Sequence, residues 1–306
     1  MSKPLLMIPG PIEISDEVFA ATQIRPASHV APDFKRSFHL ALHAMRTIWG
    51  ANDSYTPFVV SGGGTLAMES AATNLVQRGE PVLVVNTGYF GDRMAEMLHR
   101  RGAEVFQVGA QIGERVNLEE VRLALQDHKP VALFATHVDT STGVCEDVKA
   151  LAALATEAGC LSVFDGVCAT AAEDFFQVDY GADVYFTASQ KAIGLPPGLA
   201  LWVCSPAAMD RRRALTELPP HDSRLGAVGT DHGGLPQGAE RLLLNPSDHL
   251  NSRAPDLPRS ARKREHAYSL RSAQAYPSRN AEGVSSSRTE ARGSTPRPHP
   301  LRGLLA

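Results

Sequence analysis

The chain has 306 residues, which is enough for one large or two ordinary domains with a substantial core. Its formal net charge of −3 argues against a nucleic-acid partner. No stretch approaches the ~20 apolar residues of a membrane span, and the N-terminal apolar run is too short for a signal peptide. The four cysteines show no CxxC spacing and are interpreted as buried reduced thiols. We therefore expect a cytoplasmic protein, with a peroxisomal or mitochondrial location left open.

Up to about Leu215, short apolar runs alternate with amphipathic segments. The apolar runs predict seven strands, at residues 57–60, 81–86, 104–108, 131–136, 160–165, 183–187 and 199–204. The amphipathic segments predict helices at residues 66–76, 93–101, 118–127 and 148–158. Near-continuous apolar strands separated by helices indicate an α/β fold, a mostly parallel seven-stranded sheet with helices on both faces. In such sheets ligands bind beyond the carboxyl ends of the strands.

The composition changes after Glu217. No Ile, Phe, Met or Trp follows, while ten of the 21 prolines fall in this part. Such a segment cannot bury enough apolar surface to offset its ordering entropy, so we expect it to be disordered. The predicted organisation is an N-terminal arm (residues 1–15), a large domain (16–215) and a tail (216–306).

A glycine-rich turn joins the first predicted strand to the following helix. It reads Ser61-Gly62-Gly63-Gly64-Thr65. Glycines let backbone amides approach a phosphate, and the helix N-terminus adds free N–H donors and a favourable dipole. The turn lacks the spacing and lysine of a P-loop, so a nucleotide triphosphate is not expected. Alone it could be an ordinary turn.

Two buried strands end in reactive side chains. The run ending at Asp165 places a carboxylate at a strand end, and the run ending at Thr187 is followed by Gln190 and Lys191. A lysine that can form a Schiff base, with a carboxylate that keeps a pyridine nitrogen protonated, is the pair that a pyridoxal phosphate enzyme requires. With these two residues, the glycine turn becomes the expected cradle for the cofactor phosphate.

Further candidates follow the neighbouring strands. Phe90, preferred over Tyr89, could stack on the pyridine ring or pack into the core. Thr140 could donate a hydrogen bond to the cofactor or cap a helix. His137 is interpreted as structural rather than catalytic, and Cys168 as a packing residue.

These motifs resemble the class V aminotransferases of pyridoxal phosphate fold type I, in particular the alanine–glyoxylate (serine–pyruvate) aminotransferases. The resemblance covers about residues 5–215 and rests on residues 8–11, 28–34, 61–65, 136–143, 164–168, 187–194 and 196–198. It implies transfer of an amino group from alanine or serine to glyoxylate, with amino acids and 2-oxo acids as substrates. It also implies a homodimer whose active sites share residues between subunits.

The resemblance also implies residue roles. Lys191 and Asp165 would be catalytic. Gly10 would lie near the substrate carboxylate. The cofactor would be held by Gly63, Gly64, Thr65, Phe90, Thr140, Asp165, Gln190 and Lys191.

The tail does not resemble the family, whose small C-terminal domain, partner-phosphate Tyr and Thr, and carboxylate-binding Arg are not identifiable here. Suitable codons for residues 231–246, read from the second base, give IMEAYRKGQSAYFSTP, which resembles the family at this place. The hypothesis is a change of reading frame near residues 216–222. Two alternatives stay open: a desulfurase or lyase of the same class, and a non-catalytic product that binds cofactor or a sister subunit.

Overall fold

The structure is a computed structural model that describes residues 5–217, 223 and 225. These residues all belong to one compact unit, Met1–Asn245. The predicted tail therefore lies outside the described residues, except for four positions at its start. Its expected disorder and the frame-change hypothesis stay predictions.

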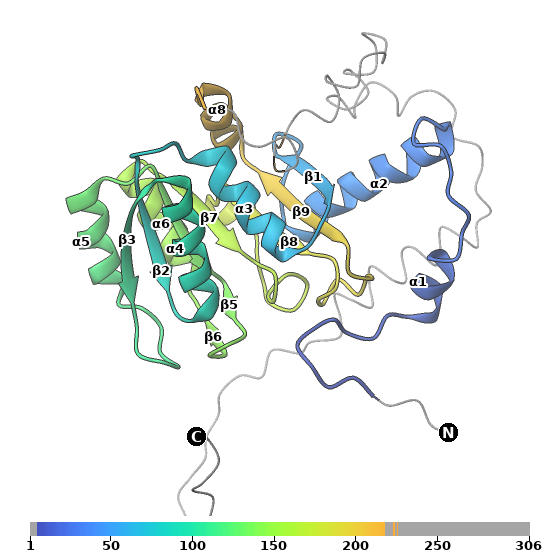
Figure 1. Cartoon of the computed structure of the whole chain (residues 1–306), viewed down its shortest axis with the longest axis horizontal. Coiled ribbons are helices and arrows are strands. Elements are labelled where there is room, and N and C mark those ends of the chain that lie inside the picture. Colours follow the sequence, from blue (N-terminus) through green and yellow to red (C-terminus); the bar gives the residue numbers. More distant parts are fainter. Residues whose placement is uncertain (1–4, 218–222, 224, 226–306) are drawn as a thin grey trace, which may run out of the picture. The chain divides into compact units, whose positions relative to one another are not determined.

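The seven predicted strands form one sheet, as expected (Figure 1). The strands are β1 (Thr56–Ser61), β2 (Pro81–Asn86), β3 (Glu104–Gly109), β4 (Ala132–Thr136), β7 (Leu161–Asp165), β8 (Val184–Ala188) and β9 (Leu199–Cys204). Their order across the sheet is β1-β9-β8-β7-β4-β2-β3. Only β9 runs against its neighbours β1 and β8; the other pairs are parallel. In β4 and β8 every residue is buried, because helices cover both faces of the sheet.

The helices divide between the two faces of the sheet. Leu83 and Val85 of β2 point toward one core, which receives α2 (Pro32–Ile48), α5 (Leu118–His128) and α6 (Val148–Ala158). Val82 and Val84 point toward the other, which receives α3 (Gly64–Leu75), α4 (Tyr89–Arg101) and α8 (Pro206–Ala214). This alternation is the period of two expected of strands.

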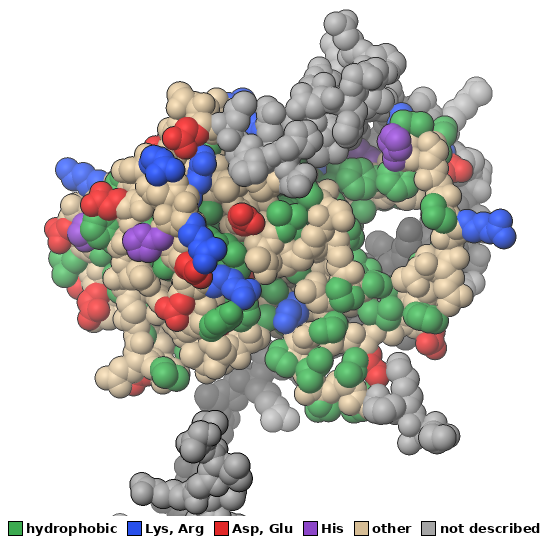
Figure 2. Space-filling view, viewed as in Figure 1, with side chains coloured by type: hydrophobic (Ala, Val, Ile, Leu, Met, Phe, Trp, Pro, Cys, Tyr) green, Lys and Arg blue, Asp and Glu red, His purple; other side chains and the backbone are tan. Residues whose placement is uncertain are grey.

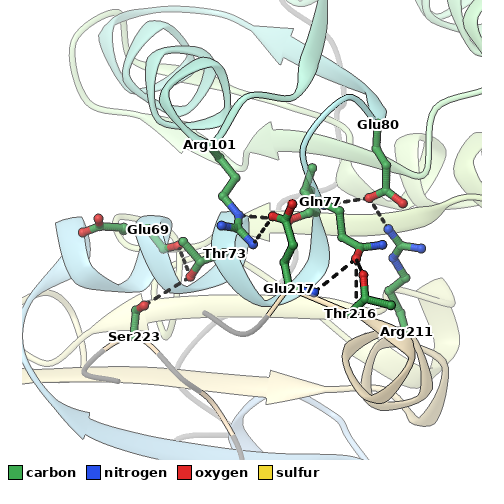
Figure 3. Close-up of polar contacts among 10 residues, drawn as sticks. Glu69, Thr73, Gln77, Glu80, Arg101, Arg211, Thr216, Glu217 and Ser223 are labelled. Atoms are coloured by element: carbon green, nitrogen blue, oxygen red, sulfur yellow. Dashed lines mark hydrogen bonds and ion pairs between the residues drawn. The ribbon is translucent and has the colours of Figure 1, made fainter. Parts of the chain in front are cut away.

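Several small elements complete the described chain. Helix α1 (Asp16–Ala21) has no buried residue, and α7 (Gln177–Tyr180) is a single short turn. Strands β5 (Val138–Asp139) and β6 (Val144–Cys145) form a hairpin beyond the end of β4. After α8, Thr216 binds the side chain of Gln77, just beyond the end of α3, and Glu217 pairs with Arg101 of α4 (Figure 3).

No helix among the described residues is long and apolar enough to cross a membrane. All four cysteines are free. Cys160 and Cys204 are buried as expected, whereas Cys145 and Cys168 are only partly buried.

Candidate active site

The candidate site lies at the edge of the sheet where the parallel strands have their carboxyl ends. The segments after β1, β2 and β8 contribute Gly64, Phe90 and Lys191, and the last residues of β4 and β7 are Thr136 and Asp165. Thr136 and Asp165 are paired in the sheet register. Parallel pairing thus brings together side chains that are far apart in the sequence.

Asp165 is held by the backbone around it. Its carbonyl accepts from His137 N at 2.8 Å, and its carboxylate oxygen Oδ1 accepts from Val167 N at 2.9 Å. Burial raises the pKa of the Asp165 carboxyl to about 7, although the Val167 N–H and the Lys191 ammonium act in the opposite direction. A buried acid of this kind favours a cationic partner.

The residue after Asp165 must be glycine. A Cβ on Gly166 would lie 1.9 Å from Cε1 of Tyr185, a ring buried in the core. The Tyr185 hydroxyl in turn lies 2.8 Å from Nδ1 of His137. Burial lowers the pKa of His137 to about 4, so its imidazole is neutral at physiological pH. These contacts agree with the structural interpretation of His137.

Lys191 follows β8 in a loop fixed by Ser189. The Ser189 hydroxyl donates to Pro196 O at 2.7 Å and accepts from Leu199 N at 3.1 Å. The Lys191 ammonium donates to Pro9 O at 3.2 Å. The N-terminal segment closes against this lysine so tightly that a Cβ on Gly10 would lie 2.4 Å from Lys191 Cδ.

The glycine turn opens α3 as predicted, with Gly63 as the N-cap residue and no side-chain cap. The free N–H groups of this helix end are therefore available to an anion. Arg93 of α4 reaches the same place, because its Nη1 donates to Thr65 Oγ1 at 3.3 Å. The motifs in the sequence did not identify this arginine.

One open pocket, with about 580 Å³ of empty space, collects most of these groups. Of the predicted residues it is lined by Gly64, Thr65, Phe90, Asp165, Gln190 and Lys191. Phe90 lines it and the adjacent Tyr89 does not; stacking of Phe90 on a cofactor ring stays a prediction. Lysine and acid thus border the same cavity.

Three predicted residues do not line this pocket. Gly63 precedes it, Gly10 touches Lys191 from the N-terminal segment, and Thr140 lies in the β5–β6 hairpin beside Cys168. Cys168 itself borders the cavity. Burial raises the pKa of the Cys168 thiol, with Lys191 and Thr140 opposing the rise, so the thiol is not set up as a ready nucleophile.

Comparison with known proteins settles the family. The class V aminotransferase family matches residues 15–217, about two thirds of the chain. The chain belongs to this family. The match ends where the composition of the sequence changes.

Individual relatives point the same way. Alanine–glyoxylate aminotransferase 1 of Saccharomyces cerevisiae is 40% identical, over 67% of this chain and 55% of its own length. L-aspartate–glyoxylate aminotransferase of Paracoccus denitrificans is 33% identical, over 78% of this chain and 62% of its own length. The crystal structure of alanine–glyoxylate aminotransferase from Nostoc sp. superimposes with a TM-score of 0.67 at 30% identity, over 72% of this chain and 60% of that one. The chain spans little more than half the length of these relatives.

Pyridoxal phosphate is the cofactor of this family, and the residues present fit it. The side-chain oxygen of Gln190 is buried, and no partner for it exists among the described residues. Amide oxygen and nitrogen are interchangeable by rotation of the side chain, so Gln190 can present its NH₂ group to a phosphate. The buried acid at Asp165, the amine at Lys191 and the open helix end complete a suitable set.

Proposed function

We propose that this chain acts as a pyridoxal phosphate-dependent transaminase that moves an amino group from alanine or serine to glyoxylate. The supporting observation is the single pocket that contains the Lys191 amine, the Asp165 carboxyl and the open N-terminus of α3. Transfer to glyoxylate yields glycine, which would connect the protein with glyoxylate metabolism and glycine biosynthesis.

The two catalytic roles fall to Lys191 and Asp165. When bound, pyridoxal phosphate supplies an aldehyde for the amino group and a ring that withdraws electrons. Lys191 would hold the cofactor through that aldehyde. During turnover its Nζ takes the Cα proton of the amino acid and releases it again, as a general base and acid. Asp165 holds the proton on the ring nitrogen by its charge.

The other predicted residues position the ligands. Gly63, Gly64, Thr65 and Gln190 would hold the phosphate, Phe90 would stack on the ring, and Thr140 would reach the ring substituents from the β5–β6 hairpin. Gly10 lies against Lys191 and so borders the place where the substrate carboxylate would lie. The names of the relatives support glyoxylate as the acceptor, with alanine and aspartate as the donors to compare.

We also propose that two copies of the chain associate. More than half of the exposed large hydrophobic side chains among the described residues lie between residues 5 and 48. Figure 2 shows hydrophobic side chains at the surface around α1 and α2. A second copy is the partner that the family resemblance implies, and it would cover these apolar side chains.

The proposal is tested with purified protein and pyridoxal phosphate. We expect visible absorbance from lysine-bound cofactor, and formation of pyruvate and glycine when alanine and glyoxylate are added. Absorbance without turnover, with alanine, serine and aspartate each tried as donor, would identify a non-catalytic cofactor-binding protein. Release of alanine or sulfide from cysteine in place of transamination would identify a desulfurase.

A further inference from the structure

We propose that Arg93 supplies the positive charge that holds the phosphate group of the cofactor. This inference rests on the proposed function, since it concerns the same pocket. Arg93 comes from α4, whereas the turn expected to bind the phosphate belongs to α3. The two helices pack side by side on one face of the sheet (Figure 1).

Contacts with three residues hold the Arg93 guanidinium, which lines the pocket. Nη1 donates to the Thr65 hydroxyl at 3.3 Å, and Nη2 donates to the Tyr89 hydroxyl at 2.8 Å. The guanidinium carbon lies 5.0 Å from the Tyr89 ring centroid and 6.0 Å from that of Phe90. These aromatic contacts orient the side chain without neutralising it.

The charge of Arg93 is available to a ligand. Among residues 5–217, 223 and 225, no carboxylate lies within ion-pairing distance of it. Figure 2 shows Lys and Arg side chains along the middle of the visible face, over the region where α3 and α4 lie. A cation without a protein partner, bordering a pocket, favours an anion there.

The position of Arg93 points to the phosphate rather than to the substrate carboxylate. Arg93 contacts Thr65, next to Gly64 in the first turn of α3. The substrate end of the pocket is expected beside Lys191, which contacts Pro9 and Gly10 instead. A phosphate carries close to two negative charges, and a helix N-terminus offers only about half a positive charge. A guanidinium supplies a further full positive charge and can bind two phosphate oxygens at once.

The test compares two ligands that differ in the phosphate. The affinities of the cofactor-free protein for pyridoxal phosphate and for pyridoxal are measured by absorbance titration. The variants are Arg93→Gln, Arg93→Lys and the control Arg100→Gln, which removes an exposed cation from the same helix. Thermal unfolding without ligand verifies that each variant is folded.

We expect Arg93→Gln to weaken the binding of pyridoxal phosphate about 10- to 100-fold, the loss expected for one charge-assisted contact. The binding of pyridoxal should weaken less than about 3-fold. Arg93→Lys should recover part of the loss, and Arg100→Gln should match the wild type. An unchanged affinity for pyridoxal phosphate in Arg93→Gln, or an equal loss for both ligands, would overturn this role. A wild-type protein that binds neither ligand would overturn the proposed function, and this inference with it.

Discussion

Among single residues, Asp165 shows the clearest effect of burial on a charge. Its carboxyl is buried, and burial raises its pKa to about 7, well above that of an exposed aspartate. A cofactor-free protein therefore binds a proton at this position on folding. A protonated pyridine nitrogen placed beside it would supply a counter-charge and so favour the ionised carboxylate.

The pH dependence of stability measures this effect. Because the pKa in the folded state is raised, Asp165 contributes stability below the unfolded pKa of about 4, and the contribution is lost as pH rises through about 7. Relative to Asp165→Asn, the cofactor-free wild type should lose about 3 kcal/mol of unfolding free energy between about pH 5 and pH 8. Urea unfolding of both proteins at each pH gives the difference. A difference that does not change with pH would show that the carboxyl is solvated.

The sequence could predict the site residues that lie at or just beyond strand ends, and not one that lies a full turn into a helix. Asp165 and Lys191 follow apolar runs, so their place at one sheet edge comes directly from parallel pairing. Arg93 carries no such signal, since it looks like any arginine on an amphipathic helix. Only the packing of α4 against α3 brings it to Thr65.

At the scale of elements, the strands were predictable because each is a short apolar run bounded by turns. All seven formed within a residue or two of the expected ends. Helix α2 was not predicted, although Phe34, Phe38 and Met45 recur at helical spacing; of its 17 residues only Met45 is buried. The β5–β6 hairpin consists of two residues on each side, too few for a visible alternation.

Helix α8 provides a test at this scale. Arg211 binds both Leu75 O, at 3.0 Å, and the carboxylate of Glu80 (Figure 3). Arg213 on the same helix pairs, within the described part of the chain, with exposed Asp210. Arg211→Gln should cost about 1–3 kcal/mol of unfolding free energy, and Arg213→Gln less than about 0.5 kcal/mol.

The pH dependence of the unfolding free energy further distinguishes Arg211→Gln from Arg213→Gln. Burial raises the pKa of Glu80, but the Arg211 contacts and the Gln77 amide outweigh it and leave the pKa lowered. The stability that Glu80 contributes is therefore present above its unfolded pKa and lost as pH falls through the folded one. Chemical unfolding of the wild type and both variants at neutral and acidic pH gives the loss of unfolding free energy in each variant. Equal losses of unfolding free energy in Arg211→Gln and Arg213→Gln would contradict the stabilising role of Arg211.

At the scale of the whole molecule, the exposed apolar side chains are unevenly placed. Leu5, Met7, Ile24 and Leu40 are between 61% and 83% exposed, and all lie before β1. An isolated chain would present them to water. This asymmetry is the basis for expecting two associated copies.

Light scattering after gel filtration tests the association. The wild type should elute with the mass of two chains. Leu40→Glu should shift it toward one chain, because a charge on α2 would be buried in the interface. Ile112→Glu, at a position 90% exposed between β3 and α5, is the matched control and should leave the mass unchanged. A single-chain mass at every concentration would refute the proposed association.

The most direct measurement locates the bond between protein and cofactor. The protein is incubated with pyridoxal phosphate, reduced with borohydride and digested, and the labelled peptide is identified by mass spectrometry. We predict one label, on Lys191, and none in Lys191→Ala. A label on another lysine, or no label in the folded wild type, would contradict it.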